Sequence, residues 1–175
     1  MSMTIKDISD YLEKIAPLNQ AEDFDNVGLL IGNETTELKG VLVTLDTLEE
    51  TIDEAIKKNC NLIISFHPII FSGLKKINGN SYVERVVLKA IQNNIAIYAT
   101  HTALDNSKVG VSAKMCEVLG LTNYSILLPK EDSTIGMGMI GDLPKPMLED
   151  DFLTFTKKTF KTNGIRFSSK TGKHI

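Results

Sequence analysis

The sequence predicts an α/β fold in which helices cover both faces of a mixed, largely parallel sheet. Three apolar runs of strand length, at 40–45, 62–66 and 95–99, alternate with segments of helical periodicity. The runs are continuously apolar, which is typical of strands that are buried on both faces. A chain of 175 residues is long enough to bury a core of this kind.

The first helix is expected to begin near residue 5 and to end before Pro17. Apolar residues recur there at helical spacing: Ile5, Ile8, Leu12 and Ile15. Thr4 suits the N-cap position, and Pro17 closes the segment. A loop is expected next, and it contains the stretch FDNVGLLIG at 24–32. Asp25 and Asn26 have side chains that bond local backbone, so we interpret them as loop-forming rather than catalytic residues.

Each apolar run is followed by a segment that reads as a helix. The expected helices are 46–59, 82–93 and 110–119. The first of them has acidic residues in its opening turns and Lys57 and Lys58 near its end, which matches the helix dipole. This alternation of strand and helix is the pattern that favours parallel strands joined by crossover helices.

The sequence changes character after Pro129. The stretch TIGMGMIGDL at 134–143 is rich in glycine and methionine, and we expect close strand packing there rather than a phosphate loop. A helix is expected over 147–160 and a short strand over 165–169. We therefore divide the chain into a main α/β metal-site domain, 1–128, and a segment of the same fold, 129–175.

Composition excludes several classes of protein. The net charge is −3, which disfavours nucleic-acid binding because that needs a clustered basic face. Neither a signal peptide nor an apolar run of membrane-spanning length is visible, so we expect a cytoplasmic protein without a membrane partner. Cys60 and Cys116 lack metal-type spacing and are expected to be free thiols.

Two of the three histidines follow predicted strands directly. His67 comes after LIISF, His101 comes after IAIYAT, and Asp105 lies four residues beyond His101. Open α/β sheets bind ligands at the carboxyl ends of their strands. Imidazole nitrogens and a carboxylate suit zinc, iron, manganese or a similar divalent ion. A structural, hydrogen-bonded role for each histidine stays open from spacing alone.

Three stretches resemble a known family. FDNVGLLIG, LIISFHPIIF and YATHTALDNSKVGVSAKMCEVLG, in this order and followed by GMGMIGDL, are similar to the Nif-three-like family of dinuclear-metal-centre proteins. Its members often carry the name of type 2 GTP cyclohydrolase I homologues. The resemblance runs from about Thr4 to the end and implies an α/β fold that assembles as a toroidal homohexamer.

The resemblance also implies a metal site. The family's HHP motif supplies two histidine ligands, and here it reads FHP, so that His67 matches the second and Phe66 replaces the first. The HTxxD motif matches His101 and Asp105, which implies that Asp105 is a ligand and His101 a ligand or an orienting group. The family's remaining His and Glu ligands lie beyond Ile175, and we expect the chain to be a fragment.

From this resemblance we expect a metal-dependent hydrolase whose substrate is an unidentified small molecule. No residue is assigned a catalytic role, and no organic cofactor is expected. The alternative is a metal-binding oligomeric scaffold or interaction protein without enzymatic activity. The replacement of a histidine ligand by Phe66 favours that alternative.

Overall fold

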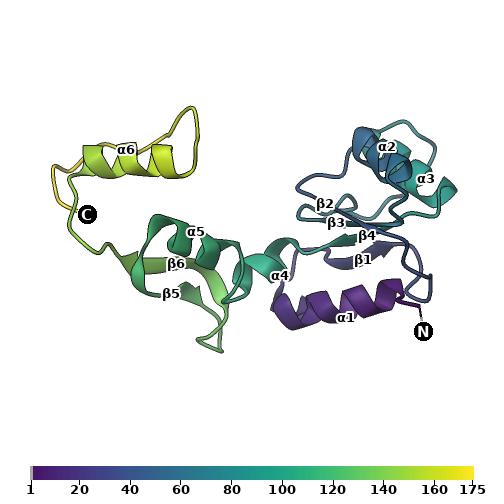
Figure 1. Ribbon diagram of the computed structural model, residues 1–175, viewed down its shortest axis with the longest axis horizontal. Helices are drawn as coiled ribbons and strands as arrows, with labels where there is room; N and C mark the ends of the chain where they lie inside the picture. Colours follow the sequence, from purple (N-terminus) through teal and green to yellow (C-terminus); the bar gives the residue numbers. More distant parts are fainter. Residues whose placement is uncertain (1) are drawn as a thin grey trace. The chain divides into compact units, whose positions relative to one another are not determined.

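The structure is a computed structural model that describes residues 2–175, and these form two compact units (Figure 1). One unit extends up to Ser107 and contains a four-stranded sheet; the other extends from Lys108 to Ile175 and contains a two-stranded sheet. This mixed arrangement confirms the predicted α/β class. None of the helices within residues 2–175 has the length and apolar character needed to cross a membrane.

The larger sheet has the strand order β1-β4-β3-β2. Its strands are β1 (Gly28–Ile31), β2 (Val41–Thr44), β3 (Leu62–Ser65) and β4 (Ala96–Ala99). Strands β2, β3 and β4 are parallel, whereas β1 runs antiparallel to β4. The register pairs Thr44 with Ser65, Ser65 with Ala99, and Ala99 with Gly28. The ends of β2, β3 and β4 and the start of β1 therefore share one edge of the sheet.

Helices cover both faces of this sheet, as predicted (Figure 1). Helices α2 (Glu49–Lys57) and α3 (Tyr82–Gln92) pack with Ile63 and Ile97 on one face. Helix α1 (Ile5–Ile15) packs with Leu62 and Tyr98 on the other face. Successive strand residues point to opposite faces, so two helical layers can bury an unbroken apolar strand.

The N-terminal helix begins where the sequence predicts. The backbone N–H of Thr4 donates to the Asp7 carboxylate over 2.7 Å, which satisfies a donor that the first helical turn leaves free. The elements that the sequence did not indicate include the strand β1, the 3-10 helix Leu18–Gln20 and a strand over Thr122–Pro129. The sequence predicts a loop at β1, which is four residues long, begins with Gly28 (φ +92°) and is followed by Gly32 (φ +110°).

The second unit contains α5 (Val111–Leu119), the hairpin β5 (Thr122–Pro129) and β6 (Gly136–Asp142), and α6 (Glu149–Thr159). The close packing expected in the Gly-rich stretch is confirmed, because a Cβ on Gly136 would collide with the carbonyl oxygen of Leu128. The strand predicted over 165–169 is wrong, since these residues lie in no strand. The predicted division into a metal-site domain, 1–128, and a segment, 129–175, stays a prediction. The boundary between the two compact units falls after Ser107, but compactness does not tell which residues form a metal site.

Candidate functional site

The candidate site lies at the edge where the three parallel strands end. Asp46 follows β2 by two residues, His67 follows β3 by two, and His101 follows β4 by two. The pairing of the strands continues to this point, since His67 N–H donates to Leu45 over 3.0 Å and His101 N–H donates to Phe66 over 3.0 Å. Because neighbouring parallel strands end side by side, the sheet itself brings these residues together.

The two histidines lie close to each other, as their positions after neighbouring strands predict. Their ring centroids are 5.6 Å apart, and the ring planes are inclined by 71°. The His67 side chain is 47% exposed and that of His101 21% exposed, so both can be reached from solvent. The sequence prediction that imidazoles from separate strands converge at this edge is consistent with this spacing.

His67 is held by Asp46 from the neighbouring strand. Its Nδ1 lies 2.7 Å from an Asp46 carboxylate oxygen. A carboxylate only accepts hydrogen bonds, so Nδ1 must carry the proton in this pair. The lone pair of the neutral ring is then on Nε2, where it can bind a ligand. Asp46 is not among the residues predicted from the sequence, although it follows its strand in the same way that each histidine does.

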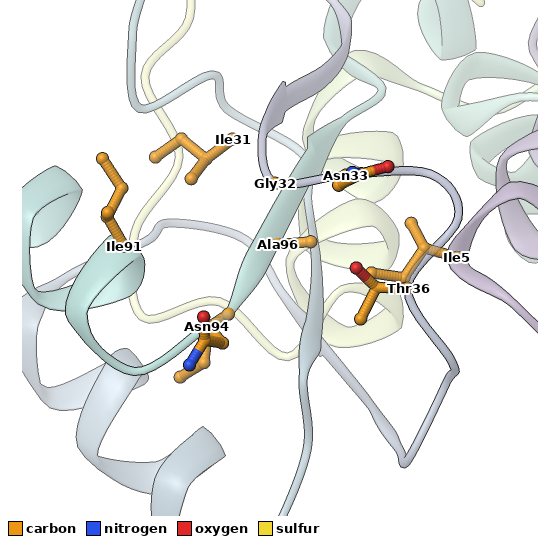
Figure 2. Close-up of a pocket in the computed structure, with 9 residues that line it drawn as sticks. Ile5, Ile31, Gly32, Asn33, Thr36, Ile91, Asn94 and Ala96 are labelled. Carbon is orange, nitrogen blue, oxygen red and sulfur yellow. The ribbon is translucent and has the colours of Figure 1, made fainter.

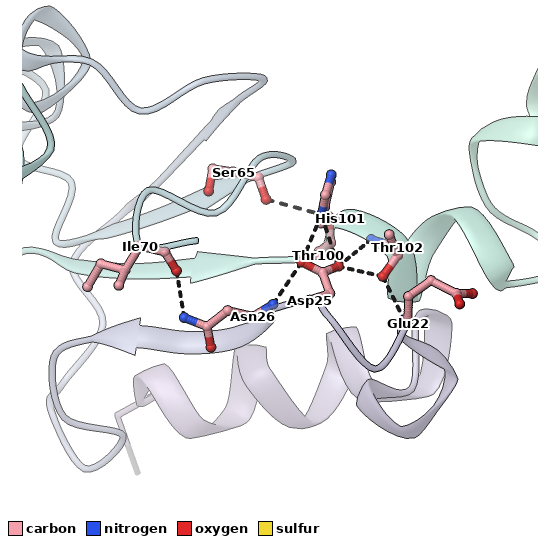
Figure 3. A network of polar contacts seen from close by, with 8 residues as sticks. All are labelled: Glu22, Asp25, Asn26, Ser65, Ile70, Thr100, His101 and Thr102. Carbon is pink, nitrogen blue, oxygen red and sulfur yellow. Dashed lines mark hydrogen bonds and ion pairs between the residues drawn. The ribbon is translucent and has the colours of Figure 1, made fainter. Parts of the chain in front are cut away.

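His101 is held by Asp25 in a larger network (Figure 3). The His101 Nδ1 lies 2.9 Å from each Asp25 carboxylate oxygen. Thr102 donates to the same carboxylate through its backbone N–H over 3.1 Å and through its hydroxyl. The backbone N–H of Asn26 completes the set over 2.8 Å. This geometry again leaves Nε2 of His101 free to bind a ligand.

The Asp25 side chain has no exposed surface. Burial acts to raise the pKa of its carboxyl, but the hydrogen bonds from Thr102, His101 and Asn26 outweigh burial and hold the pKa below its ordinary value. Asp25 is therefore ionised at neutral pH and can orient His101. The loop-forming interpretation of Asp25 is incomplete, because only the antiparallel β1 brings this loop to the edge of the sheet. The adjacent Asn26 does fix a loop, since it donates to the carbonyl of Ile70 over 2.6 Å.

The backbone at His101 is unusual. Its φ is +25°, in the left-handed region that residues with a Cβ rarely adopt. This residue starts the helix α4 (His101–Asn106) immediately after β4 and the linking Thr100. The sharp change of direction points the imidazole out from the edge of the sheet (Figure 3). Strained residues held by their surroundings are frequent at binding and catalytic sites.

Asp105 lies on α4, one helical turn after His101. Partial burial raises the pKa of its carboxyl above the ordinary value; His101 opposes the rise, the negative Asp25 adds to it, and His67 opposes it. Asp105 therefore lies within electrostatic range of both histidines. Among residues 2–175, however, no three His, Cys, Asp or Glu side chains are already arranged to hold a metal ion together. The assignment of His67, His101 and Asp105 as ligands stays a prediction.

Two further positions bear on the site. The Phe66 ring, which replaces a histidine of the resembled motif, lies with its centroid 5.0 Å from that of His67 and 5.5 Å from that of His101. His174 belongs to the second unit, where it forms an isolated bridge with Leu148.

A cavity of about 270 Å³ lies at the opposite edge of the sheet (Figure 2). Its lining includes Gly32, which follows β1, and Asn94, which precedes β4. No residue in this lining carries a titratable side chain. The histidines at the other edge therefore offer the better chemistry for a reaction.

The fold and the site together define a class of protein. It is an α/β protein in which two histidines, each oriented by a carboxylate, follow neighbouring parallel strands. Carboxylate-held imidazoles with a free Nε2 are a common arrangement at metal centres.

Comparison with known proteins gives the family. The model of the Duf34/NIF3 (NGG1p interacting factor 3) family matches residues 3–175, and the chain belongs to this family. A relative from Clostridium acetobutylicum, named GTP cyclohydrolase 1 type 2 homolog, is 35% identical over 177 residues, which cover 100% of this chain and 66% of the relative. A relative of the same name from Staphylococcus epidermidis is 38% identical over 148 residues, which cover 85% of this chain and 40% of the relative. The chain thus spans less than two thirds of the length of these relatives.

Solved structures agree. A crystal structure of a Staphylococcus aureus hypothetical protein superposes with a TM-score of 0.92 at 31% identity, over 100% of this chain and 70% of that one. A Bacillus cereus protein related to NIF3 superposes with a TM-score of 0.91 at 23% identity, over 99% of this chain and 74% of that one. Both structures support the fold.

Proposed function

We propose that the protein binds a divalent metal ion through His67 and His101, with the Asp105 carboxylate close by, and acts as a metal-dependent hydrolase. One observation carries the proposal: the two imidazoles lie 5.6 Å apart while each Nδ1 is bonded to a carboxylate. Both rings therefore keep Nε2 for a ligand. Neutral imidazole with a fixed tautomer is the form that binds zinc, iron or manganese.

The donor types at this edge would suit such an ion as an open site. Zinc in catalytic sites binds three protein ligands and keeps one position for water or substrate, and the two histidines with Asp105 would be such a set. A bound divalent ion would supply Lewis acidity for hydrolysis. Asp25 and Asp46 would fix the two rings in place. The negative charge of the fully buried Asp25 would also stabilise a cation at this edge. The exposed His67 faces solvent, from which a substrate would arrive.

The test of metal binding uses His67→Ala with His174→Ala as its matched control. After incubation with Zn²⁺ and dialysis, metal content is measured by plasma mass spectrometry and helix content by circular dichroism. We expect His67→Ala to lose most of its zinc with an unchanged spectrum, and His174→Ala to retain zinc like the wild type. Equal zinc content in both variants would refute the assignment.

A hydrolase screen separates the two candidate functions. Phosphate ester, phosphodiester, nucleotide and amide substrates are tested with the zinc-loaded protein, with and without chelator. Chelator-sensitive turnover that His101→Ala abolishes supports the enzyme, and the relatives named GTP cyclohydrolase 1 type 2 homolog make nucleotides the first substrates to test. Bound metal without any chelator-sensitive turnover would favour the metal-binding scaffold.

The proposal includes a cytoplasmic location and assembly into a homohexamer. The cytoplasm is supported by two free cysteines, Cys60 and Cys116, since a reducing compartment keeps thiols free. Self-association is supported by large apolar side chains left exposed on the hairpin of the second unit, including Leu128 and Ile140. Sedimentation equilibrium measures the oligomeric state directly. A monomer at micromolar concentration would exclude the hexamer for this chain.

A further inference from the structure

Three aromatic rings meet at the histidine edge, and only two of them can bind a metal. The centroid distances are 5.0 Å between Phe66 and His67, 5.5 Å between Phe66 and His101, and 5.6 Å between the histidines. The three rings thus form a nearly equilateral triangle in which each meets the others edge to face. The phenyl ring contributes carbon and hydrogen alone to the third corner.

The spacing of the two imidazoles suits one shared cation. With a zinc–nitrogen bond of about 2.1 Å and a ring centroid about 1.2 Å from its nitrogen, two imidazoles on one tetrahedral ion have centroids about 5.4 Å apart. The observed separation is 5.6 Å. A two-metal centre instead holds ions about 3.5–4 Å apart, and each ion needs protein donors of its own.

Of the two carboxylates that hold the histidines, Asp25 is already engaged, because it is fully buried and accepts four hydrogen bonds. Asp46 accepts from His67 through one of its carboxylate oxygens. Phe66 also lines an apolar cavity of about 260 Å³ together with Leu12 and Leu104.

We infer that Phe66 restricts this site to a single divalent cation by placing an apolar ring where a second cation would need a ligand. This inference rests on the proposed function. Phe66 acts here as a specificity-determining residue, since a second ion beside the phenyl edge would lose hydration without gaining a donor. The two histidines and Asp105 are then donors for one ion only.

The experiment measures how many ions the chain binds. Wild type, Phe66→His, Phe66→Cys and Phe66→Leu are titrated with Zn²⁺ by equilibrium dialysis, and Mn²⁺-loaded samples are examined by electron paramagnetic resonance for coupled pairs. We expect one equivalent without coupling in wild type and Phe66→Leu. A second, weaker equivalent is expected in Phe66→His or Phe66→Cys, because imidazole and thiolate are both metal ligands.

The outcomes separate this inference from the proposed function. Wild type that binds no zinc overturns both. Wild type that binds two equivalents, or that shows a coupled manganese pair, overturns the restriction by Phe66 and leaves metal binding in place. Folded Phe66→His and Phe66→Cys proteins that still bind one equivalent also overturn it. If neither Phe66→His nor Phe66→Cys folds, the zinc stoichiometry and the manganese spectrum of the wild type still support or overturn the inference.

Discussion

Substitution of Asp25 by asparagine tests the physical basis of the site without any metal. The carboxylate is fully buried and accepts from His101, from the Asn26 backbone and twice from Thr102. A carboxamide has one oxygen and directs N–H groups at the remaining donors. At least one buried donor then loses its acceptor, which costs about 1–3 kcal/mol, and the hydrogen bonds to a charged acceptor are weakened as well. We expect Asp25→Asn to lower the free energy of unfolding by about 2–4 kcal/mol at pH 7.

The assay is urea denaturation of the metal-free protein followed by circular dichroism. Asp23→Asn is the matched control, because Asp23 is exposed and lies two residues earlier in the same loop. We expect the control to unfold within about 0.5 kcal/mol of wild type. An Asp25→Asn protein as stable as this control would refute the reasoning.

Acidification adds a second check on Asp25. Because its pKa is lower in the folded than in the unfolded protein, ionised Asp25 stabilises the fold above the unfolded value of about 3.9. This stabilisation is lost as the pH falls through the lower, folded value. The difference between wild type and Asp25→Asn should therefore shrink as the pH drops below about 4. A difference that stays constant or grows on acidification would contradict the lowered pKa.

Three further predictions follow from the fold and the site. Ile97→Ala removes a side chain with no exposed surface from the middle of the sheet and should cost about 2–5 kcal/mol in urea unfolding; a cost below about 1 kcal/mol would contradict its place in the core. Gly32 has φ +110°, which residues with a Cβ rarely adopt, and a Cβ there would lie 2.5 Å from the Ala96 Cβ, so we expect Gly32→Ala to lower the melting temperature. An unchanged melting temperature would contradict this backbone conformation at Gly32. Asp46→Asn should weaken Zn²⁺ binding about 10–100-fold in competition with a chelator while His67 stays in place, and an unchanged affinity would show that Asp46 does not orient His67.

Much of the sheet could be predicted from local sequence. The runs that form β2, β3 and β4 are continuously apolar, and the helices between them have amphipathic spacing. The type of each element therefore follows from the pattern of apolar residues in the sequence. Strand β1 could not be found in this way. Its four residues begin with Gly28 and are followed by Gly32, and both glycines have positive φ. Its pairing with β4 depends on residues about seventy positions away. The error at 165–169 has the same origin, since a strand exists only where it has a partner.

The sequence by itself determined that two histidines stand directly after strands of a parallel sheet, because strand periodicity and position along the chain are local properties. Only the tertiary structure decided which groups hold them. Asp25 lies 76 residues from His101, and Asp46 lies 21 residues from His67. Each pair meets because the ends of β2, β3 and β4 and the start of β1 lie at one edge of the sheet. Hydrogen bonds depend on distance in space, and the strand order β1-β4-β3-β2 that sets those distances cannot be read from any single stretch of the chain.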